Sequence, residues 1–282
     1  MKSSTPFSPT RNLCVGTLLL VNLLMVIPWA LPHRLFGQAT PEKTEVQPEV
    51  PDWALPGGPN HKQYPPPANF HRPTKTFATP IGIFQGQSDV GGPLVAGSAV
   101  YDAKTQEYTV TSAGYNIWYT RDEFRYLWKK IAGDVSFAAN VTFPVPQDPP
   151  HDRKVVLVIR QDLDDDSKEI MAAEHGTGMV HLAVRAEKTA LIKDMQFRIG
   201  GSLLQGVMPK RIGIEKHGDD FSLFISVQGE PMHQYGPSIQ LHLAAPFYVG
   251  IGFCSHLPVT PDSGVFSGVL LANRAGKLHK PM

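Results

Sequence analysis

The sequence predicts an all-β fold, a jelly-roll sandwich of two antiparallel sheets. From Thr76 onward, short runs rich in Val, Ile, Phe, Tyr and Thr alternate with Gly, Asp, Asn and Pro, as strands and turns do. More than a dozen such runs follow one another, with turn signals at roughly 8 to 12 residue intervals, which is typical of sandwiches and barrels. No segment keeps a helical period, although 164–173 could form a short helical turn.

The strand pattern is regular enough to place each element. We expect strands near 97–102, 106–113, 125–131, 133–143, 153–160, 170–175, 178–186, 194–199, 209–217, 220–227, 238–243, 247–254 and 264–272. In the run DFSLFISV, apolar residues at Phe221, Leu223, Ile225 and Val227 share one face, and a tight turn at 217–219 precedes it. The two flanking strands should therefore form an antiparallel hairpin.

The N-terminus has the layout of a signal peptide. Basic residues precede an apolar run over 13–31, and Gly37 and Ala39 form a small-x-small cleavage site, which predicts removal of residues 1–39. The alternative is an uncleaved membrane anchor, because the run approaches the roughly 18 residues that a span needs. With cleavage, the chain is exported to the periplasm, the cell surface or the medium, and no membrane span is left.

Residues 40–75 form a proline-rich linker without apolar periodicity, which predicts an extended spacer. Alternatively, this segment wraps the folded domain, with Trp53, Tyr64 and Phe70 as anchors. The domain proper then covers 76–282.

Charge and cysteine content exclude some classes of protein. The chain has 26 Lys and Arg against 25 Asp and Glu, and residues 1–39 hold three of the basic residues and no acid, which leaves 23 against 25, a net charge of −2. This balance gives no basic footprint for a nucleic acid. Cys254 is the one cysteine beyond the signal peptide, so no disulfide stabilises the domain, and we expect this thiol to pack as a small apolar side chain.

Metal and cofactor motifs are absent from the sequence, and we expect no cofactor. The histidines lack the paired spacing of a zinc site. Acidic residues cluster at Asp162–Asp166, where a solvated turn is the expected structure and a structural Ca²⁺ loop is the alternative.

Five blocks carry a resemblance to a known family. They are SDVGGPLVAGSAVYD from Ser88, YTVTSAGYNIWYTRDEFRYLWKKIAGDVSFAANVTF from Tyr108, KVVLVIRQDLDDDSKE from Lys154, IGIEKHGDDFSLFISVQG from Ile212 and FYVGIGFCSH from Phe247. In this order they resemble a bacterial exported family that is similar to the concanavalin A-like lectins and glucanases, and whose members often bear the label of a TolB-type or TolR-type biopolymer transporter. The resemblance implies a sandwich of two curved antiparallel sheets and supplies no catalytic residues. The glucanase pattern Glu-x-Asp-x-x-Glu is absent here.

The block GYNIWYTRDEF contains the first candidate binding residues. Tyr115 and Trp118 offer aromatic faces beside the polar groups of Asn116 and Asp122, and sugars bind to this combination. The alternative is that Trp118 is a core residue between the sheets.

Three further candidates, Arg160, His175 and Arg185, belong to apolar strands. With Glu174 they could line the concave sheet, on a rigid scaffold. The alternative is an ion-pair network in which an arginine pairs with Glu174, Glu187 or Glu215.

The function we expect is non-catalytic binding of a glycan or another envelope polymer. One alternative is a polysaccharide hydrolase with carboxylates from separate strands, Asp122 with Glu174 or Glu215. A second alternative is a structural or interaction protein of the cell envelope, which the proline-rich linker would suit.

Overall fold

The computed structural model describes residues 72–145, 152–198 and 207–278. The predicted signal peptide and nearly all of the predicted linker, including Trp53, Tyr64 and Phe70, lie outside these ranges. Within them the chain forms strands and turns and no helix. It follows that no helix in the described part has the length and hydropathy needed to cross a membrane.

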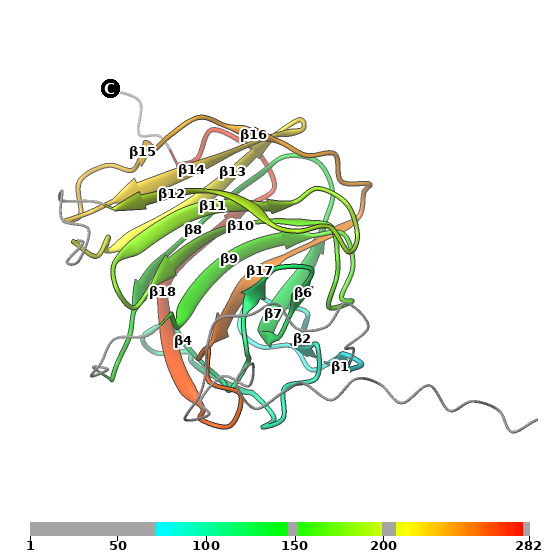
Figure 1. The fold of residues 1–282 in the computed structure, drawn as a ribbon. Helices are drawn as coiled ribbons and strands as arrows, with labels where there is room; N and C mark the ends of the chain where they lie inside the picture. Colours follow the sequence, from blue (N-terminus) through cyan, green and yellow to red (C-terminus); the bar gives the residue numbers. More distant parts are fainter. Residues whose placement is uncertain (1–71, 146–151, 199–206, 279–282) are drawn as a thin grey trace, which may run out of the picture. The chain divides into compact units, whose positions relative to one another are not determined.

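Two large antiparallel sheets form the sandwich (Figure 1). The front sheet has the order β1-β2-β7-β17-β9-β10-β11-β12. Its strands are β1 (Lys75–Phe77), β2 (Gly86–Val90), β7 (Phe124–Ile131), β17 (Phe247–Cys254), β9 (Lys154–Arg160), β10 (Glu169–His175), β11 (Met179–Arg185) and β12 (Lys193–Arg198).

The back sheet has the order β15-β14-β13-β8-β18-β4-β3, and β16 also pairs with β14. Its strands are β15 (His233–Gln234), β14 (Asp220–Ser226), β13 (Arg211–His217), β8 (Val135–Thr142), β18 (Asp262–Ala272), β4 (Glu107–Ser112), β3 (Ser98–Asp102) and β16 (Ile239–Gln240). A separate hairpin joins β5 (Ile117–Trp118) and β6 (Arg121–Asp122). The predicted jelly-roll sandwich of two antiparallel sheets is confirmed.

Alternation along each front strand divides its side chains between two faces. On β9, Val155, Leu157 and Ile159 enter the core between the sheets, whereas Val156 and Val158 join a second apolar cluster on the outer face. Ile117 of the β5–β6 hairpin belongs to that second cluster. The hairpin therefore packs onto the outer face of the front sheet.

Most predicted strands appear within two residues of their expected bounds, and the hairpin of β13 and β14 is confirmed. Gly218 takes the turn with a φ of 60°, a conformation that suits glycine. The predicted strand 238–243 shrinks to β16, and the expected helical turn over 164–173 is wrong because its second half is β10. The pattern missed β1, β2, β5, β6 and β15, which are short or polar and owe their structure to a neighbouring strand.

Candidate functional site

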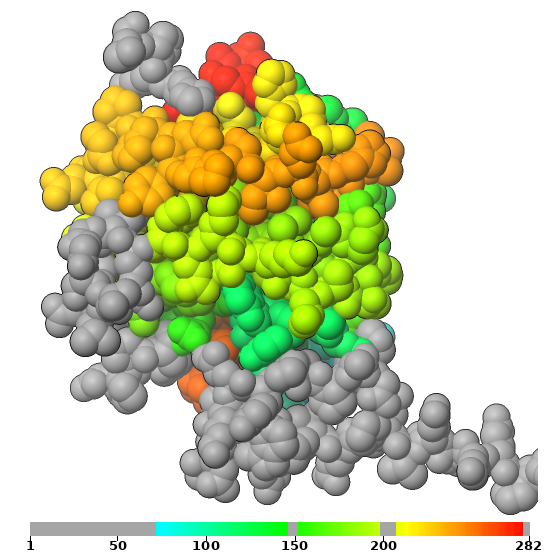
Figure 2. Space-filling view, turned by 45° about the horizontal axis from the view of Figure 1, so that its top comes forward, coloured from blue at the N-terminus to red at the C-terminus, as the bar shows by residue number. Residues whose placement is uncertain are grey.

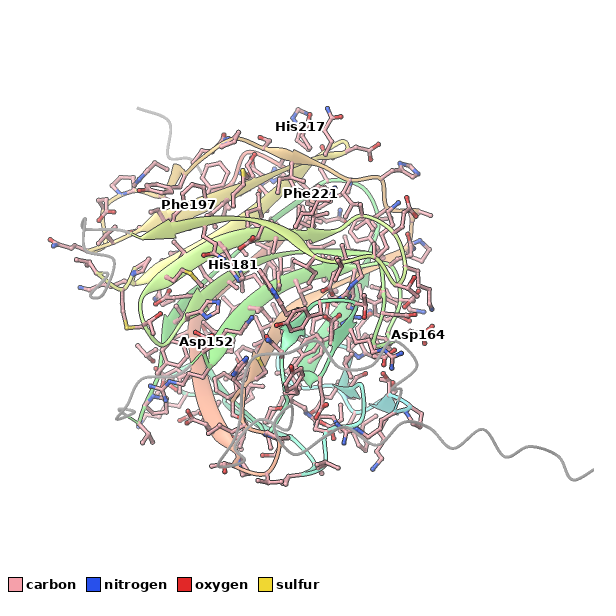
Figure 3. All side chains as sticks on the ribbon, in the orientation of Figure 1. Asp152, Asp164, His181, Phe197, His217 and Phe221 are labelled. Atoms are coloured by element: carbon pink, nitrogen blue, oxygen red, sulfur yellow. The ribbon has the colours of Figure 1, made fainter. Side chains whose placement is uncertain are left out.

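Polar and charged side chains gather at two ends of the outer face of the front sheet. Because β9, β10 and β11 are antiparallel, the first residue of one strand lies beside the last residue of the next: Glu169 is opposite Arg160 and Arg185, and His175 is opposite Lys154. We call the two sets the closed end (Arg160, Glu169, Arg185 and Asp122) and the open end (the pocket around Lys154, His175 and His181). Figure 3 shows Asp152, beside the open end, and Asp164, beside the closed end, at opposite sides of the sheet.

The closed end is a buried ion cluster. Arg185 donates two hydrogen bonds to Asp122, at 2.6 Å to Oδ1 and 2.7 Å to Oδ2, and Arg160 donates a third at 3.2 Å. Glu169 lies 3.4 Å from Arg185 and 3.5 Å from Arg160. All four side chains have 0% exposure. The two arginines and the two carboxyl groups thus pair with one another out of reach of a ligand.

Burial and the neighbouring carboxylate of Asp122 raise the pKa of Glu169, against the opposing effect of Arg160 and Arg185. Such a shift is expected where two carboxylates share a dry site. The closed end consequently has a structural role: it ties the β5–β6 hairpin, through Asp122, to β9, β10 and β11.

The β5–β6 hairpin positions side chains at both ends of the sheet. Tyr119 turns the chain with a φ of 52°, and its carbonyl accepts a hydrogen bond from the amide of Ile192 at 3.0 Å. Asp122 then reaches the closed end, while Trp118 stacks on His181 at the open end with ring centroids 5.5 Å apart. In Figure 2 the blue-green surface around this hairpin borders the yellow-green surface of β9–β12.

The open end is a pocket with a volume of about 110 Å³. Its walls come from the hairpin, from the segment before β9, and from β9 to β12. The lining residues are Asn116, Trp118, Asp152, Lys154, His175, Met179, His181 and Gln196. A whole drug-sized ligand requires about 300 to 1,000 Å³, so this pocket accepts one ring or one side group of a larger molecule.

Lys154 is a buried cation at the open end. Its side chain is 2% exposed, and its ammonium donates one long hydrogen bond, 3.4 Å, to the carbonyl of Ile117. The ammonium also lies 5.2 Å from the centroid of the Trp118 ring. Burial lowers its pKa, and no carboxylate of the described residues comes within ion-pairing distance. Lys154 thus differs from the arginines at the closed end, each of which contacts a carboxylate.

Two histidines lie beside Lys154, with their rings edge to face at 5.0 Å. His181 Nδ1 is 3.3 Å from Asp194, and His175 Nδ1 is 3.7 Å from Asp152. Burial lowers the pKa of His175 to about 3 and also lowers that of His181, with Lys154 adding to both shifts, so both rings are neutral at pH 7. Among the described residues, neither Nε2 atom has a hydrogen-bond partner.

The predicted candidates divide between the two ends. Asn116, Trp118 and His175 line the pocket, whereas Asp122, Arg160 and Arg185 form the closed end. Tyr115 stacks on His256 with centroids 5.9 Å apart, and Asn116 contacts the same histidine at 3.0 Å, so Tyr115 supports the pocket from outside.

Sequence reasoning missed five pocket residues: Asp152, Lys154, Met179, His181 and Gln196. Alternation could have found two of them, because Lys154 shares a face with Arg160 on β9, and His181 shares one with Arg185 on β11. Trp118 is half-buried on the outer face, so its alternative placement between the sheets is wrong. Cys254 is buried in the outer apolar cluster as expected, and burial raises its pKa to about 11.

The expected position of Glu174 is wrong. Its neighbours Ala173 and His175 lie on the outer face, so Glu174 points into the core between the sheets, where it is 0% exposed. The ion-pair network exists, but its acids are Asp122 and Glu169. Glu187 instead pairs with Lys168 at the surface, at 3.5 Å.

The hydrolase arrangement is also wrong. Asp122 is buried at the closed end, Glu174 lies between the sheets, and Glu215 accepts a hydrogen bond from Ser136, 2.8 Å away, within the back sheet. Because Ile212 and Ile214 face the core, Glu215 lies on the far face of that sheet. These carboxylates cannot flank one glycosidic bond.

The acidic loop 162–166 already pairs with a cation, the side chain of Lys188. The ammonium of Lys188 contacts Asp164 and lies 3.3 Å from Asp166 and 3.9 Å from Asp162. In the described ranges, no three His, Cys, Asp or Glu residues are grouped so as to hold a metal ion. The Ca²⁺ alternative therefore has no support in this loop.

Comparisons with known proteins return structural similarity alone. No family model and no curated protein matches the chain. A functionally unknown protein from Saccharomyces cerevisiae has a TM-score of 0.49 and 13% identity, over 64% of this chain and 93% of the other. The alginate lyase from Klebsiella pneumoniae has a TM-score of 0.39 and 10% identity, over 64% and 84%. The basic winged bean lectin with Tn-antigen has a TM-score of 0.37 and 10% identity, over 71% of this chain and 99% of the lectin chain.

At these identities and TM-scores the similarity concerns architecture and assigns no activity to this chain. The resemblance to an exported family labelled as biopolymer transporters stays a prediction.

Proposed function

We propose that the chain is an exported glycan-binding module whose ligand occupies the open end of the front sheet. The observation that carries this proposal is Trp118, a half-buried ring that borders a pocket of hydrogen-bonding side chains. Asn116, Asp152 and Gln196 supply polar groups in that pocket. Apolar sugar faces pack on such rings while hydroxyls bond to the polar groups.

The size of the pocket defines the mode of binding. With about 110 Å³, it accepts one sugar ring or a substituent, and the rest of a polymer would extend over the surface of β9–β12. The role is binding without hydrolysis, because the carboxyl groups at the closed end are buried and paired with arginine, and Asp152 is the one carboxylate among the residues that line the pocket.

Export completes the proposal and rests on the signal-peptide pattern of residues 1–39. Amino-terminal sequencing of the chain recovered outside the cytoplasm tests it. A first residue at Thr40 supports cleavage, and an intact Met1 contradicts it.

A Trp118→Ala variant tests the site. We expect wild-type chain to bind members of a glycan array and the variant to lose at least tenfold in affinity, since stacking on a ring is removed while the apolar cluster under the hairpin stays. Phe77→Ala is the matched control, because Phe77 is an exposed ring on β1 at the far edge of the same sheet. Equal binding by wild type and Trp118→Ala would refute this site, and no binding by wild type would refute the function.

A further inference from the structure

The chemistry of the pocket identifies a class of sugar. Lys154 has one long hydrogen bond and no carboxylate in ion-pairing range within the described chain. A buried ammonium without a counterion is costly, unless a ligand supplies one. An oxygen anion on the ligand would match this group directly.

The other groups facing the pocket require hydrogen-bond donors. Asp194 accepts from His181 Nδ1, so the proton of this neutral ring is on Nδ1 and Nε2 is an acceptor. The carboxylate of Asp152 is part-exposed and is likewise a hydrogen-bond acceptor. Sugar hydroxyls donate to both kinds of group.

The two aspartates also limit the charge of the ligand. Lys154 contributes one positive charge, Asp152 and Asp194 contribute two negative charges, and His175 and His181 are neutral. The two carboxylates repel any anion and repel a dianion such as a phosphate ester about twice as strongly, so the site favours a single negative charge in direct contact with Lys154.

On these grounds we propose that the open end binds the carboxylate of a uronic-acid residue, held by Lys154, while ring hydroxyls donate to Asp152 and to Nε2 of His181. This inference rests on the proposed glycan-binding function and names its ligand class. The polymer is thus an acidic polysaccharide built from uronic-acid residues.

Matched ligands test the carboxylate directly. Trisaccharides of galacturonate, glucuronate, mannuronate and guluronate are titrated calorimetrically into the purified chain, each beside its carboxyl-reduced counterpart of the same stereochemistry. We expect at least one uronate to bind about 10- to 100-fold more tightly than its reduced form, the range for a hydrogen bond to a charged group.

Variants of the lysine test its role. Lys154→Met should lose the same 10- to 100-fold for the uronate and less than threefold for the reduced sugar, and Lys154→Arg should keep part of the preference. Lys104→Met removes an exposed lysine in the β3–β4 turn and should change neither affinity. A thermal melt checks folding, and we expect Lys154→Met to melt at or above the wild-type temperature because it removes an unpaired buried charge.

The possible failures are distinguishable. If acidic and reduced sugars bind equally, Lys154→Met has no effect and Trp118→Ala abolishes both, the carboxylate assignment is wrong and the glycan-binding function stands. If a sulfated neutral sugar binds more tightly than every uronate, the assignment is also wrong. If no sugar binds the wild-type chain, both proposals are wrong.

Discussion

The two ends of β9, β10 and β11 belong to the same strands, but their charged side chains differ in whether they have a counterion. At the closed end, Arg160 and Arg185 meet Asp122 and Glu169, and every charge has an opposite neighbour. At the open end, Lys154 has none in ion-pairing range among the described residues, and the two histidines are neutral.

The difference separates structure from binding. The four side chains of the closed end pair with one another where no ligand can reach them, and they hold the hairpin in place. The open end differs: Lys154 donates one long hydrogen bond, and the Nε2 atoms of His175 and His181 have no hydrogen-bond partner among the described residues, so this pocket can still bind a polar ligand. The hairpin connects the two ends, because Asp122 anchors it at the closed end and Trp118 lines the pocket at the open end.

The largest expected effect on stability comes from a substitution that breaks the closed end. Asp122→Asn removes one of the two carboxylates that compensate Arg160 and Arg185, so we expect the free energy of unfolding to fall by about 3 to 5 kcal/mol. Urea denaturation followed by tryptophan fluorescence measures it. Asp164→Asn is the control: its carboxylate is exposed and pairs with the exposed Lys188, so its loss should cost less than about 1 kcal/mol. A cost below 1 kcal/mol for Asp122→Asn as well would mean that the cluster does not stabilise the fold.

Protonation of the open end has the next largest effect. Because the pKa of His175 is about 3 in the folded chain and near 6.5 unfolded, the unfolded state binds more protons as pH falls below 6.5, and stability is lost progressively down to about pH 3. At pH 4.5, two units below the pKa of the unfolded state, this loss amounts to about 2 to 3 kcal/mol of the free energy of unfolding.

His175→Gln should remove that part of the pH dependence. The measurement is the difference in unfolding free energy between pH 6.5 and 4.5, compared between variant and wild type, so that contributions of other groups cancel. His217→Gln is the control, since His217 is an exposed residue at the β13–β14 turn. An unchanged slope in His175→Gln would show that the ring is already charged or solvated at neutral pH.

Much of the fold was predictable, and the site only partly so. The continuous apolar run KVVLVIR predicted β9 with Arg160 at its end, because one strand carries that information. Pairing across the sheet is different: the meeting of Asp122 with two arginines depends on where a two-residue strand docks, and no local pattern sets that. Glu174 was misplaced next to His175 although adjacent strand residues face opposite sides, so the period of two already contained the correction.

Glu174 lies beside His175 at the end of β10, but on the inner face of the front sheet. Its carboxylate oxygens have no hydrogen-bond partner among the described residues, and burial raises its pKa well above the usual value, so the folded state holds this proton to a higher pH than the unfolded state does. For an acid with a raised pKa the folded state binds more protons, and stability falls as pH rises from about 4.5.

Glu174→Met should therefore stabilise the chain at pH 7 by about 1 to 3 kcal/mol, through removal of an unsatisfied buried group, and the gain should shrink toward pH 4. Denaturant unfolding at the two pH values measures it. Sugar affinity should stay within twofold of wild type, because the residue lies on the other face from the pocket. A loss of stability at pH 7 would mean that Glu174 has a stabilising partner, and that the inner face, like the closed end, compensates its charge.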